Sequence, residues 1–470
     1  MSTTTVSPRT GRIPFSGTPA QAAVRLARAG LHGAGGEYVV YEREGAWWYA
    51  GGVRARLVAD RTHVTLDHEG TRIRTPWQGD PLETVHRMLS SLPYAQWRAY
   101  GWAAFELSYA LAGEAAGLGE EPLVHLVVPR TEIRLSADGA EIRCSDEAEE
   151  VLVRALLEDA GPEPLQGEFT PLPVDLGGPA EAEYRAGVAS AVASIRAGDL
   201  QKVILSRAVR VEGELDLPAT YLTGRAVNSP ARSFLLDLGG IEAAGFSPET
   251  VVEVSADGHV STQPLAGTRA LSGDRAEDAA RRAELLTDAK EIYEHAISVQ
   301  VAWDEMLGVC RPGSVRAEEF MSVKERGSVQ HIASRVSGRL ARADRGPWPA
   351  LAAVFPAVTA SGVPKRAAYR TIRELEPGPR GLYSGAVLSV GSDGSLDAAL
   401  VLRTVFRQGG RTWLRAGAGI VEQSLPEREF EETCEKLRSV SRTLVPAAGV
   451  TAAGAVAASG GAAGGARTRQ

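Results

Sequence analysis

The segment RAGAGIVEQSLPEREFEETCEK, residues 415–436, joins a glycine-containing turn to a run of residues with helical spacing. Ser424 and Glu427 have the spacing of a capping box, and Pro426 would lie in the first turn, so the pattern predicts that a helix begins here. A turn rich in backbone donors next to a charged helix is typical of a place that holds a metal ion and an anion.

Acidic side chains recur on one face of this helix and of a second one. Glu429, Glu432 and Lys436 fall one turn apart, and upstream the segment DAKEIYEHAISVQ places Glu291 and Glu294 three residues apart. Two such helices facing each other would present four carboxylates, which suit a hard cation such as magnesium. The alternative is a pair of solvated charged helices, the commoner origin of such a pattern.

Length and charge set broad limits on function. A chain of 470 residues has room for two or three domains or for one large enzyme domain. Hydrophobic residues make up 44% and charged residues 23%, as in ordinary soluble globular proteins. The net charge of -7 argues against broad binding of nucleic acid or of an anionic membrane surface. An anionic substrate would therefore depend on local arginines and a metal.

Cysteine usage and the N-terminal sequence predict a cytoplasmic protein. The three cysteines, Cys144, Cys310 and Cys434, are scattered, so we expect neither a disulfide framework nor a zinc cluster. The N-terminal MSTTTVSPRTGRIPF lacks the apolar run of a signal peptide, and no stretch reaches the length of a transmembrane helix.

The pattern along the chain favours an α+β protein. Most predicted strands come as hairpins, which favours antiparallel sheets with flanking helices over a doubly wound parallel sheet. A loop rich in proline and glycine, residues 161–179, separates an N-terminal part, residues 1–180, from a core at residues 181–445. The Ala/Gly-rich tail, residues 446–470, is expected to be disordered.

Six further segments complete a recognisable set. They are QKVILSR (201–207), GFSPET (245–250), PLAGTRAL (264–271), KERGSVQHIAS (324–334), FPAVTASGVPK (355–365) and PRGLYSGAV (379–387). With the two glutamate helices, this set resembles the chorismate-utilising enzymes, which include anthranilate, aminodeoxychorismate, isochorismate and salicylate synthases. The resemblance is strong over residues 180–445 and loose before them. Among the branches, the chain is most similar to the salicylate synthases of mycobactin-type siderophore pathways.

The resemblance implies a fold and a ligand set. It implies a single large α+β domain in which two antiparallel sheets are flanked by helices, with magnesium and chorismate in a deep cleft. Glu294 and Glu432 would hold the magnesium, with Glu291 and Glu429 supporting them, and the metal would take the ring carboxylate of chorismate. Other residues would contact the substrate itself: Gly267, Thr268, His331, Tyr383, Arg403, Gly419 and Lys436.

Three of these residues would hold the carboxylate of the enolpyruvyl arm. Arg403 offers a planar fork, Tyr383 a hydroxyl and the glycine turn near Gly419 a backbone donor. Thr268 and His331 would shape the pocket around the ring. Each has an ordinary structural alternative, namely a strand arginine, a core tyrosine, a glycine that merely permits a turn, a strand threonine and a core histidine.

The resemblance also implies a catalytic base and a catalytic acid. Lys202 would activate water for attack at ring carbon two, which requires that it shed its proton near neutral pH, and Glu249 would stay protonated and protonate the hydroxyl that leaves ring carbon four. Without the resemblance, Lys202 would be taken for a surface lysine and Glu249 for an acid at the start of a helix.

Two positions favour water over an amine as the nucleophile. Anthranilate synthases usually have glutamine in place of Lys202, and aminodeoxychorismate synthases usually have a lysine where this chain has Ala266. We therefore predict a salicylate synthase acting through isochorismate, with an isochorismate synthase that stops after the first step as the alternative. An anthranilate synthase component I and a non-catalytic chorismate-binding subunit are further alternatives. The chain lacks the cysteine elbow of a glutamine amidotransferase, and the resemblance implies a monomer without such a partner.

Overall fold

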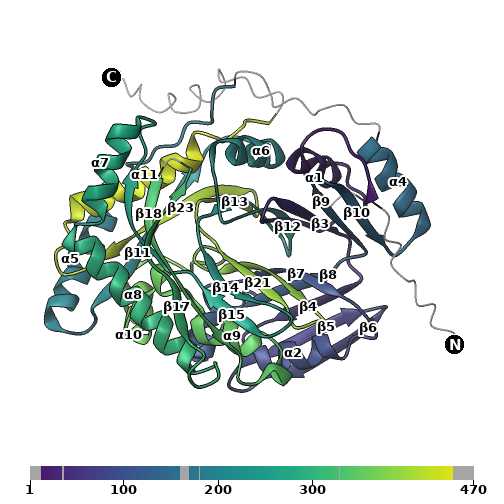
Figure 1. Cartoon of the computed structure of the whole chain (residues 1–470), viewed down its shortest axis with the longest axis horizontal. Coiled ribbons are helices and arrows are strands. Elements are labelled where there is room, and N and C mark those ends of the chain that lie inside the picture. The colour runs from purple at the N-terminus through teal and green to yellow at the C-terminus, as the bar shows by residue number, and fades with distance from the viewer. Residues whose placement is uncertain (1–11, 34–35, 159–168, 179, 328, 448–470) are drawn as a thin grey trace, which may run out of the picture.

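Two large antiparallel sheets face each other in the computed structural model, and helices cover their outer surfaces (Figure 1). The predicted α+β fold with two antiparallel sheets and flanking helices is confirmed. The predicted tail and much of the predicted 161–179 loop lie outside the residues that the structure describes. Those residues are 12–33, 36–158, 169–178, 180–327 and 329–447.

The strands of the first sheet run antiparallel to their neighbours. In spatial order they are β1 (Arg12–Ile13), β10 (Gly139–Cys144), β9 (Thr131–Ser136), β3 (Ala46–Gly51), β2 (Tyr38–Arg43), β12 (Arg232–Leu238), β13 (Ile241–Ser247), β22 (Thr404–Gln408), β23 (Arg411–Ile420), β11 (Lys202–Val211) and β19 (Gly362–Val363).

The second sheet is built in the same way. Its strands are, in spatial order, β16 (Leu265–Ala270), β18 (Val329–Arg339), β15 (His259–Thr262), β14 (Thr250–Val254), β21 (Leu396–Leu400), β20 (Ala386–Gly391), β7 (Arg98–Ala103), β8 (Val124–Val128), β4 (Ala55–Ala59), β5 (His63–His68) and β6 (Thr71–Pro76), while β17 (Arg316–Arg326) pairs with β18.

Helices divide between the two outer surfaces. Those against the first sheet are α1 (Pro19–Arg28), α4 (Glu147–Glu158), α5 (Ala180–Ala197), α6 (Leu217–Val227), α10 (Lys365–Leu375) and α11 (Pro426–Ser441). Those against the second sheet are α2 (Pro81–Ser90), α7 (Arg275–Leu285), α8 (Ala289–Leu307) and α9 (Trp348–Val354). Short elements include α3 (Leu107–Leu111), η1 (Ala115–Gly117), η2 (Ala343–Arg345) and η3 (Val358–Ala360). No helix among the described residues is long and apolar enough to span a membrane.

Strand order reveals an internal repeat that links the two parts of the chain. In the first sheet β10, β9, β3 and β2 are mirrored by β23, β22, β13 and β12, and in the second β5, β4, β8 and β7 are mirrored by β15, β14, β21 and β20. The halves meet where β2 pairs with β12 and β7 with β20. Strands from residues 1–180 and from residues 181–445 therefore share both sheets.

Apart from the two-residue strand β19, which joins the first sheet between β18 and β20 of the second, the chain of each half crosses twice from one sheet to the other. The crossings of the first half lie between β3 and β4 and between β8 and β9, and those of the second half lie between β13 and β14 and between β21 and β22. At these crossing points the end of a strand of one sheet lies next to the start of a strand of the other.

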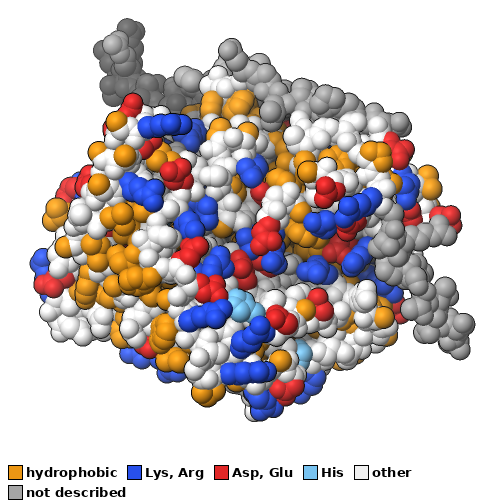
Figure 2. Space-filling model, in the orientation of Figure 1, with side chains coloured by type: hydrophobic (Ala, Val, Ile, Leu, Met, Phe, Trp, Pro, Cys, Tyr) orange, Lys and Arg blue, Asp and Glu red, His pale blue; other side chains and the backbone are white. Residues whose placement is uncertain are grey.

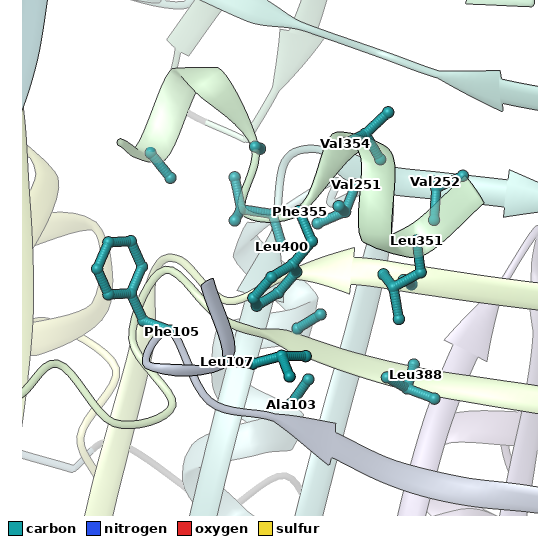
Figure 3. Packing of buried hydrophobic residues seen from close by; sticks show 14 of the residues in the cluster. Ala103, Phe105, Leu107, Val251, Val252, Leu351, Val354, Phe355, Leu388 and Leu400 are labelled. Atoms are coloured by element: carbon teal, nitrogen blue, oxygen red, sulfur yellow. The ribbon is translucent and has the colours of Figure 1, made fainter. Parts of the chain in front are cut away.

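The alternating pattern of the strands fills the space between the sheets and under the helices. In β12, Phe234 and Leu236 pack in the core between the sheets, whereas Leu235 points the other way and packs under the helices of the first sheet. On the far side of the second sheet, helix α9 places Leu351 over the sheet, beside Leu388 (Figure 3). Apolar side chains therefore fill the layer between the sheets and the spaces between each sheet and the helices that cover it.

One buried ion pair fastens the two sheets to each other. Arg232 on β12 donates two hydrogen bonds to Asp397 on β21, at 2.8 Å to Oδ1 and 2.7 Å to Oδ2. Tyr41 on β2 also donates to Asp397, and the Arg232 guanidinium contacts Glu253 at 2.6 Å. Burial opposes ionisation of Asp397, but Arg232 outweighs it and holds the pKa of that carboxyl below its usual range.

We predict that Asp397→Asn lowers the free energy of unfolding by about 3 kcal/mol, because the buried guanidinium of Arg232 loses its main counter-charge. Urea unfolding would measure the loss. The matched control is Asp257→Asn, since Asp257 pairs with Arg339 at 2.8 Å on the exposed surface, where solvent screens the pair, and its loss should change the free energy of unfolding far less. Equal losses in the two variants would contradict a special role of the buried pair.

Candidate active site

Most of the predicted site residues line one cavity of about 770 Å³. It lies beside the two crossings of the second half, which are hydrogen-bonded to each other: the Leu400 N–H donates to the Glu249 carbonyl at 3.1 Å and the Phe246 N–H to the Arg403 carbonyl at 3.2 Å. Figure 2 shows acidic and basic side chains interspersed across the middle of this face of the molecule. The predicted residues in the wall are Glu249, Gly267, Thr268, Glu291, Glu294, His331, Tyr383, Arg403, Gly419, Glu432 and Lys436.

Helices α8 and α11 supply the four glutamates, as the sequence pattern predicts. Helix α11 begins at Pro426 as expected, but the predicted capping box is wrong. Leu425 is the N-cap residue, and the Ser424 hydroxyl instead accepts the backbone N–H of Val421 at 3.1 Å. The reason is that the chain turns tightly out of β23 before the helix, so Ser424 closes that turn.

Each of the four carboxylates faces its own cationic side chain. The pairs are Glu294 with Lys202 at 2.8 Å, Glu432 with Lys436 at 2.8 Å, Glu429 with Lys290 at 3.0 Å and Glu291 with Arg269 at 3.3 Å. Within the described residues no three acidic, His or Cys side chains converge as a metal site. The carboxylates repel one another, and each turns toward the nearest positive charge.

This mutual repulsion contributes to the raised pKa values of Glu291 and Glu429. Burial, reinforced by Glu294 and Glu432, raises the pKa of Glu291 to about 7. Burial and the neighbouring Glu432 raise the pKa of Glu429, whereas Lys436 overcomes burial at Glu432 and keeps its pKa below the usual range. A set of carboxylates that hinder one another's ionisation is stabilised by a bound divalent cation, so the donor set fits magnesium.

Lys202 lies at the start of β11 with its side chain fully buried. Its amine contacts Glu294 at 2.8 Å and donates to the Ser298 hydroxyl at 3.3 Å. The alternative of a surface lysine is therefore wrong. Lys202 lies just behind the cavity wall and meets the cavity through Glu294, while Glu429 is buried behind Lys290.

Glu249 lies on the crossing between β13 and β14 and is only 3% exposed. The alternative of an acid at the start of a helix is wrong, because the chain passes here from strand to strand. Burial raises the pKa of Glu249 to about 8, against the opposing effects of Thr359 and Lys202. The Thr359 hydroxyl donates to its Oε1 at 2.7 Å. Glu249 is therefore largely protonated at neutral pH.

His331, Thr268, Gly267 and Arg403 form one hydrogen-bonded group. Arg403 donates to Nε2 of His331 at 2.8 Å, so Nδ1 carries the proton and faces the Gly267 carbonyl and the Thr268 hydroxyl, each at 3.1 Å. Burial and the Arg403 charge lower the pKa of His331 to about 3, which keeps the ring neutral. Arg403 has a φ of 50°, a strained conformation for a non-glycine residue on the second crossing.

Gly417 and Gly419 do not form the predicted turn. Both lie within strand β23, where Gly419 pairs with Ile204 of β11. A Cβ on Gly419 would lie 2.5 Å from Oε1 of Glu294, so the absence of a side chain makes room for that carboxylate. A Cβ on Gly417 would lie 3.1 Å from the hydroxyl of the buried Tyr383, and the Gly417 carbonyl accepts the Lys436 amine at 2.8 Å.

Three polar residues of the site carried no predicted role. Lys290 pairs with Glu429, Arg269 pairs with Glu291, and the Thr359 hydroxyl donates to Glu249. Lys290 lies one residue before Glu291 in the segment DAKEIYEHAISVQ. The signal that could have pointed to Lys290 is a carboxylate on α11, Glu429, that needs a cationic partner. Nothing in the local sequence around Thr359 distinguishes it from a loop threonine.

Comparison with known proteins identifies the family. The family model of chorismate binding enzyme matches residues 37–442. This chain belongs to that family. The chorismate binding enzyme described here is 43% identical over 435 residues to a salicylate synthase of Mycolicibacterium paratuberculosis, covering 92% of this chain and 95% of that protein. It is 37% identical to anthranilate synthase component 1 of Bacillus subtilis over 56% of this chain and 51% of the relative.

Solved structures of the chorismate binding enzyme fold agree with these matches. Anthranilate synthase component I of Streptococcus pneumoniae superposes with a TM-score of 0.70 at 27% identity, covering 84% of this chain and 92% of that one. MenF, the menaquinone-specific isochorismate synthase of Escherichia coli, superposes with a TM-score of 0.69 at 20% identity, covering 93% and 94%. The second likeness concerns the fold alone.

We predict that the Glu249 carboxyl titrates with a midpoint near pH 8, as burial raises its pKa to about 8. The infrared difference spectrum between the protein and Glu249→Gln would show a protonated carboxyl band at pH 7 that disappears above pH 8. Thr359→Val should move the midpoint upward by about one pH unit, because the lost hydrogen bond favours the ionised form. Thr359→Ser, which keeps the hydroxyl, should leave it in place. A downward shift in Thr359→Val would contradict this account.

Proposed function

We propose that this protein is a salicylate synthase that converts chorismate, through isochorismate, to salicylate and pyruvate. The observation that carries the proposal is that a buried lysine, Lys202, and a buried and largely protonated carboxyl, Glu249, both lie beside one cavity. The 43% identity with a salicylate synthase over 92% of the chain supports it.

The first step is an exchange of hydroxyl groups on the ring. Lys202, the proposed base, accepts a proton from water while the water oxygen bonds to ring carbon two. Both ring double bonds shift, from carbons one–two and five–six to carbons six–one and four–five, the bond between carbon four and its hydroxyl breaks, and Glu249 donates the proton that lets this hydroxyl leave as water. One water enters and one leaves, so chorismate and isochorismate are isomers.

The second step needs a held conformation more than a catalytic group. Hydrogen moves from ring carbon two to the methylene of the arm, the ether bond breaks, pyruvate leaves and the ring becomes aromatic. Arg403 and Tyr383 would hold the arm carboxylate, and Thr268 and the neutral His331 would shape the pocket around the ring. Because His331 stays neutral, it adds no charge beside the ring.

Magnesium is the proposed cofactor. Glu294 and Glu432 would hold it, with Glu291 and Glu429 in support, and when bound it would take the ring carboxylate of the substrate and neutralise it. Release of Lys202 and Lys436 from their present carboxylate partners would accompany binding. We also propose that the protein acts as a cytoplasmic monomer without a glutamine amidotransferase, and that its product enters a siderophore or another aryl-capped natural product.

An isochorismate synthase is the second candidate, since the groups of the first step do not by themselves require the second. An amine-using enzyme is disfavoured by Lys202 and Ala266, and a non-catalytic subunit is disfavoured because Lys202, Glu249 and the four glutamates are all present. The deciding experiment incubates the protein with chorismate and magnesium, without ammonia or glutamine, and identifies products by liquid chromatography with mass detection. Salicylate with pyruvate supports the proposal, whereas isochorismate alone supports the second candidate.

We predict that Lys202→Ala abolishes salicylate formation from chorismate but leaves added isochorismate able to lose pyruvate, because the second step does not use this base. The expected loss in the first step is about 10²-fold or more, the usual contribution of a positioned general base. Feeding isochorismate serves as the internal control for an intact cavity. Salicylate formation from chorismate at the unaltered rate would show that Lys202 is not the base.

We predict that Glu294→Gln combined with Glu432→Gln weakens magnesium binding by about tenfold or more and removes activity, since an amide is a poor ligand for a hard cation. Calorimetric titration with magnesium would measure binding independently of turnover. Glu431→Gln on the same helix, whose side chain is 45% exposed and pairs with Arg438, is the matched control. Retained activity that a chelator still suppresses would place the metal elsewhere.

A further inference from the structure

A second cavity, of about 480 Å³, lies at the crossings of the first half of the repeat. Its wall contains residues of the crossing from β3 to β4 and of the crossing from β8 to β9. These crossings are hydrogen-bonded to each other, with the Arg54 N–H donating to the Val128 carbonyl at 2.9 Å and the Arg130 N–H to the Gly51 carbonyl at 3.1 Å. By topology the cavity is the counterpart of the active site in the other half.

Arginines dominate the charge of this cavity. Its wall holds four arginines, Arg54, Arg98, Arg130 and Arg143, against two glutamates, Glu69 and Glu132. This excess of positive charge stands on a protein whose formal net charge is -7. In Figure 2, basic side chains gather around acidic ones on the part of this face where Figure 1 places β9 and β10.

Arg130 pairs with Glu149 at 3.2 Å, whereas the other three arginines are only partly neutralised by the protein. Arg98 and Arg143 share one carboxylate, Glu132, and each lies 3.6 Å from it, beyond the length of an N–H···O hydrogen bond. Glu132 is fixed in place because the buried Tyr100 donates its hydroxyl to Oε1 at 2.5 Å. The guanidinium of Arg54 lies 3.7 Å above the ring of Tyr94 and forms no ion pair with any residue that the structure describes.

The four guanidinium groups come from both sheets. Arg98 begins β7 of the second sheet, Arg143 lies in β10 of the first, and Arg54 and Arg130 lie on the two crossings. Their side chains are partly exposed, at 32% for Arg98 and 48% for Arg143, so a ligand can reach them from solvent. An oxyanion held between them would connect the ends of both sheets.

We propose that this cavity is a second binding site, for a small anion with two or more negative charges carried on phosphate or carboxylate groups. Guanidinium forks match such oxyanions in charge and geometry, and Arg54, Arg98 and Arg143, which lack a close carboxylate partner, line one space of metabolite size. The ligand is held by charge and hydrogen bonds, and its binding stabilises the fold by joining the two sheets.

The test titrates the intact protein with pyrophosphate and, separately, with citrate, in a calorimeter and at physiological salt. Binding of pyrophosphate alone assigns a phosphate ligand, and binding of citrate alone assigns a polycarboxylate. Arg98→Gln combined with Arg143→Gln should weaken binding by about tenfold or more, because two charge-assisted contacts are lost. The same anion should raise the unfolding temperature of the unaltered protein and not that of the double variant.

Two control variants separate this site from other anion sites. Arg72→Gln alters an arginine on β6 whose side chain is 74% exposed, and it should leave binding unchanged. Arg403→Gln removes the anion-binding arginine of the active site and should also leave it unchanged. Binding that is lost in Arg403→Gln but kept in the double variant would assign the anion to the active site and overturn the proposal. Equal binding by all variants, or none by the unaltered protein, would overturn it as well. Single variants at Arg98 and Arg143 replace the double variant should it fail to fold.

Discussion

The site depends on the hydrogen bonds between the two crossings of the second half of the chain. The Leu400 N–H meets the Glu249 carbonyl and the Phe246 N–H meets the Arg403 carbonyl, so neither crossing can move without the other. This arrangement holds the backbones of Glu249 and Arg403 on neighbouring crossings between the two sheets. Strain at Arg403, with its φ of 50°, is tolerated because the surrounding strands determine the path of the chain on both sides.

The second constraint is the balance of charge around the glutamates. Four carboxylates and four cations occupy one region, and each carboxylate is paired with a different cation. Pairing avoids the cost of leaving any of these buried charges alone. A metal ion held by these carboxylates, as proposed above, would compete with lysine and arginine for the same oxygens. Lys202 would be part of this competition, which would link the proposed metal site to the proposed base of the first step.

The local sequence pattern was enough to predict the strands and helices, but not the role of every residue within them. The hairpin pattern predicted antiparallel sheets, and the Glu-x-x-Glu spacing predicted both glutamate helices correctly. The glycines of β23 were misread as a turn, because the sequence does not show that Gly419 lies in a strand against Glu294, where a Cβ would come within 2.5 Å of Oε1. The capping box was misread because Ser424 is needed by the turn before the helix.

Other features of the site could not be predicted because they join distant parts of the chain. Thr359 meets Glu249 across 110 residues, and Lys290 meets Glu429 across 139. The repeat also could not be predicted, because it is defined by the order of strands in the two sheets. The roles of Lys202 and Glu249 came from resemblance to a family, and burial is what makes those roles physically reasonable.

The two halves of the repeat show how burial changes what the cavities beside equivalent crossings can do. In the second half, Glu249 is 3% exposed and burial raises its pKa to about 8. Over the first half, Arg98 and Arg143 remain 32% and 48% exposed, and water screens their charges. A screened site can bind an ion reversibly but has little power to shift a proton. The same crossing geometry therefore suits catalysis in one half and ligand binding in the other.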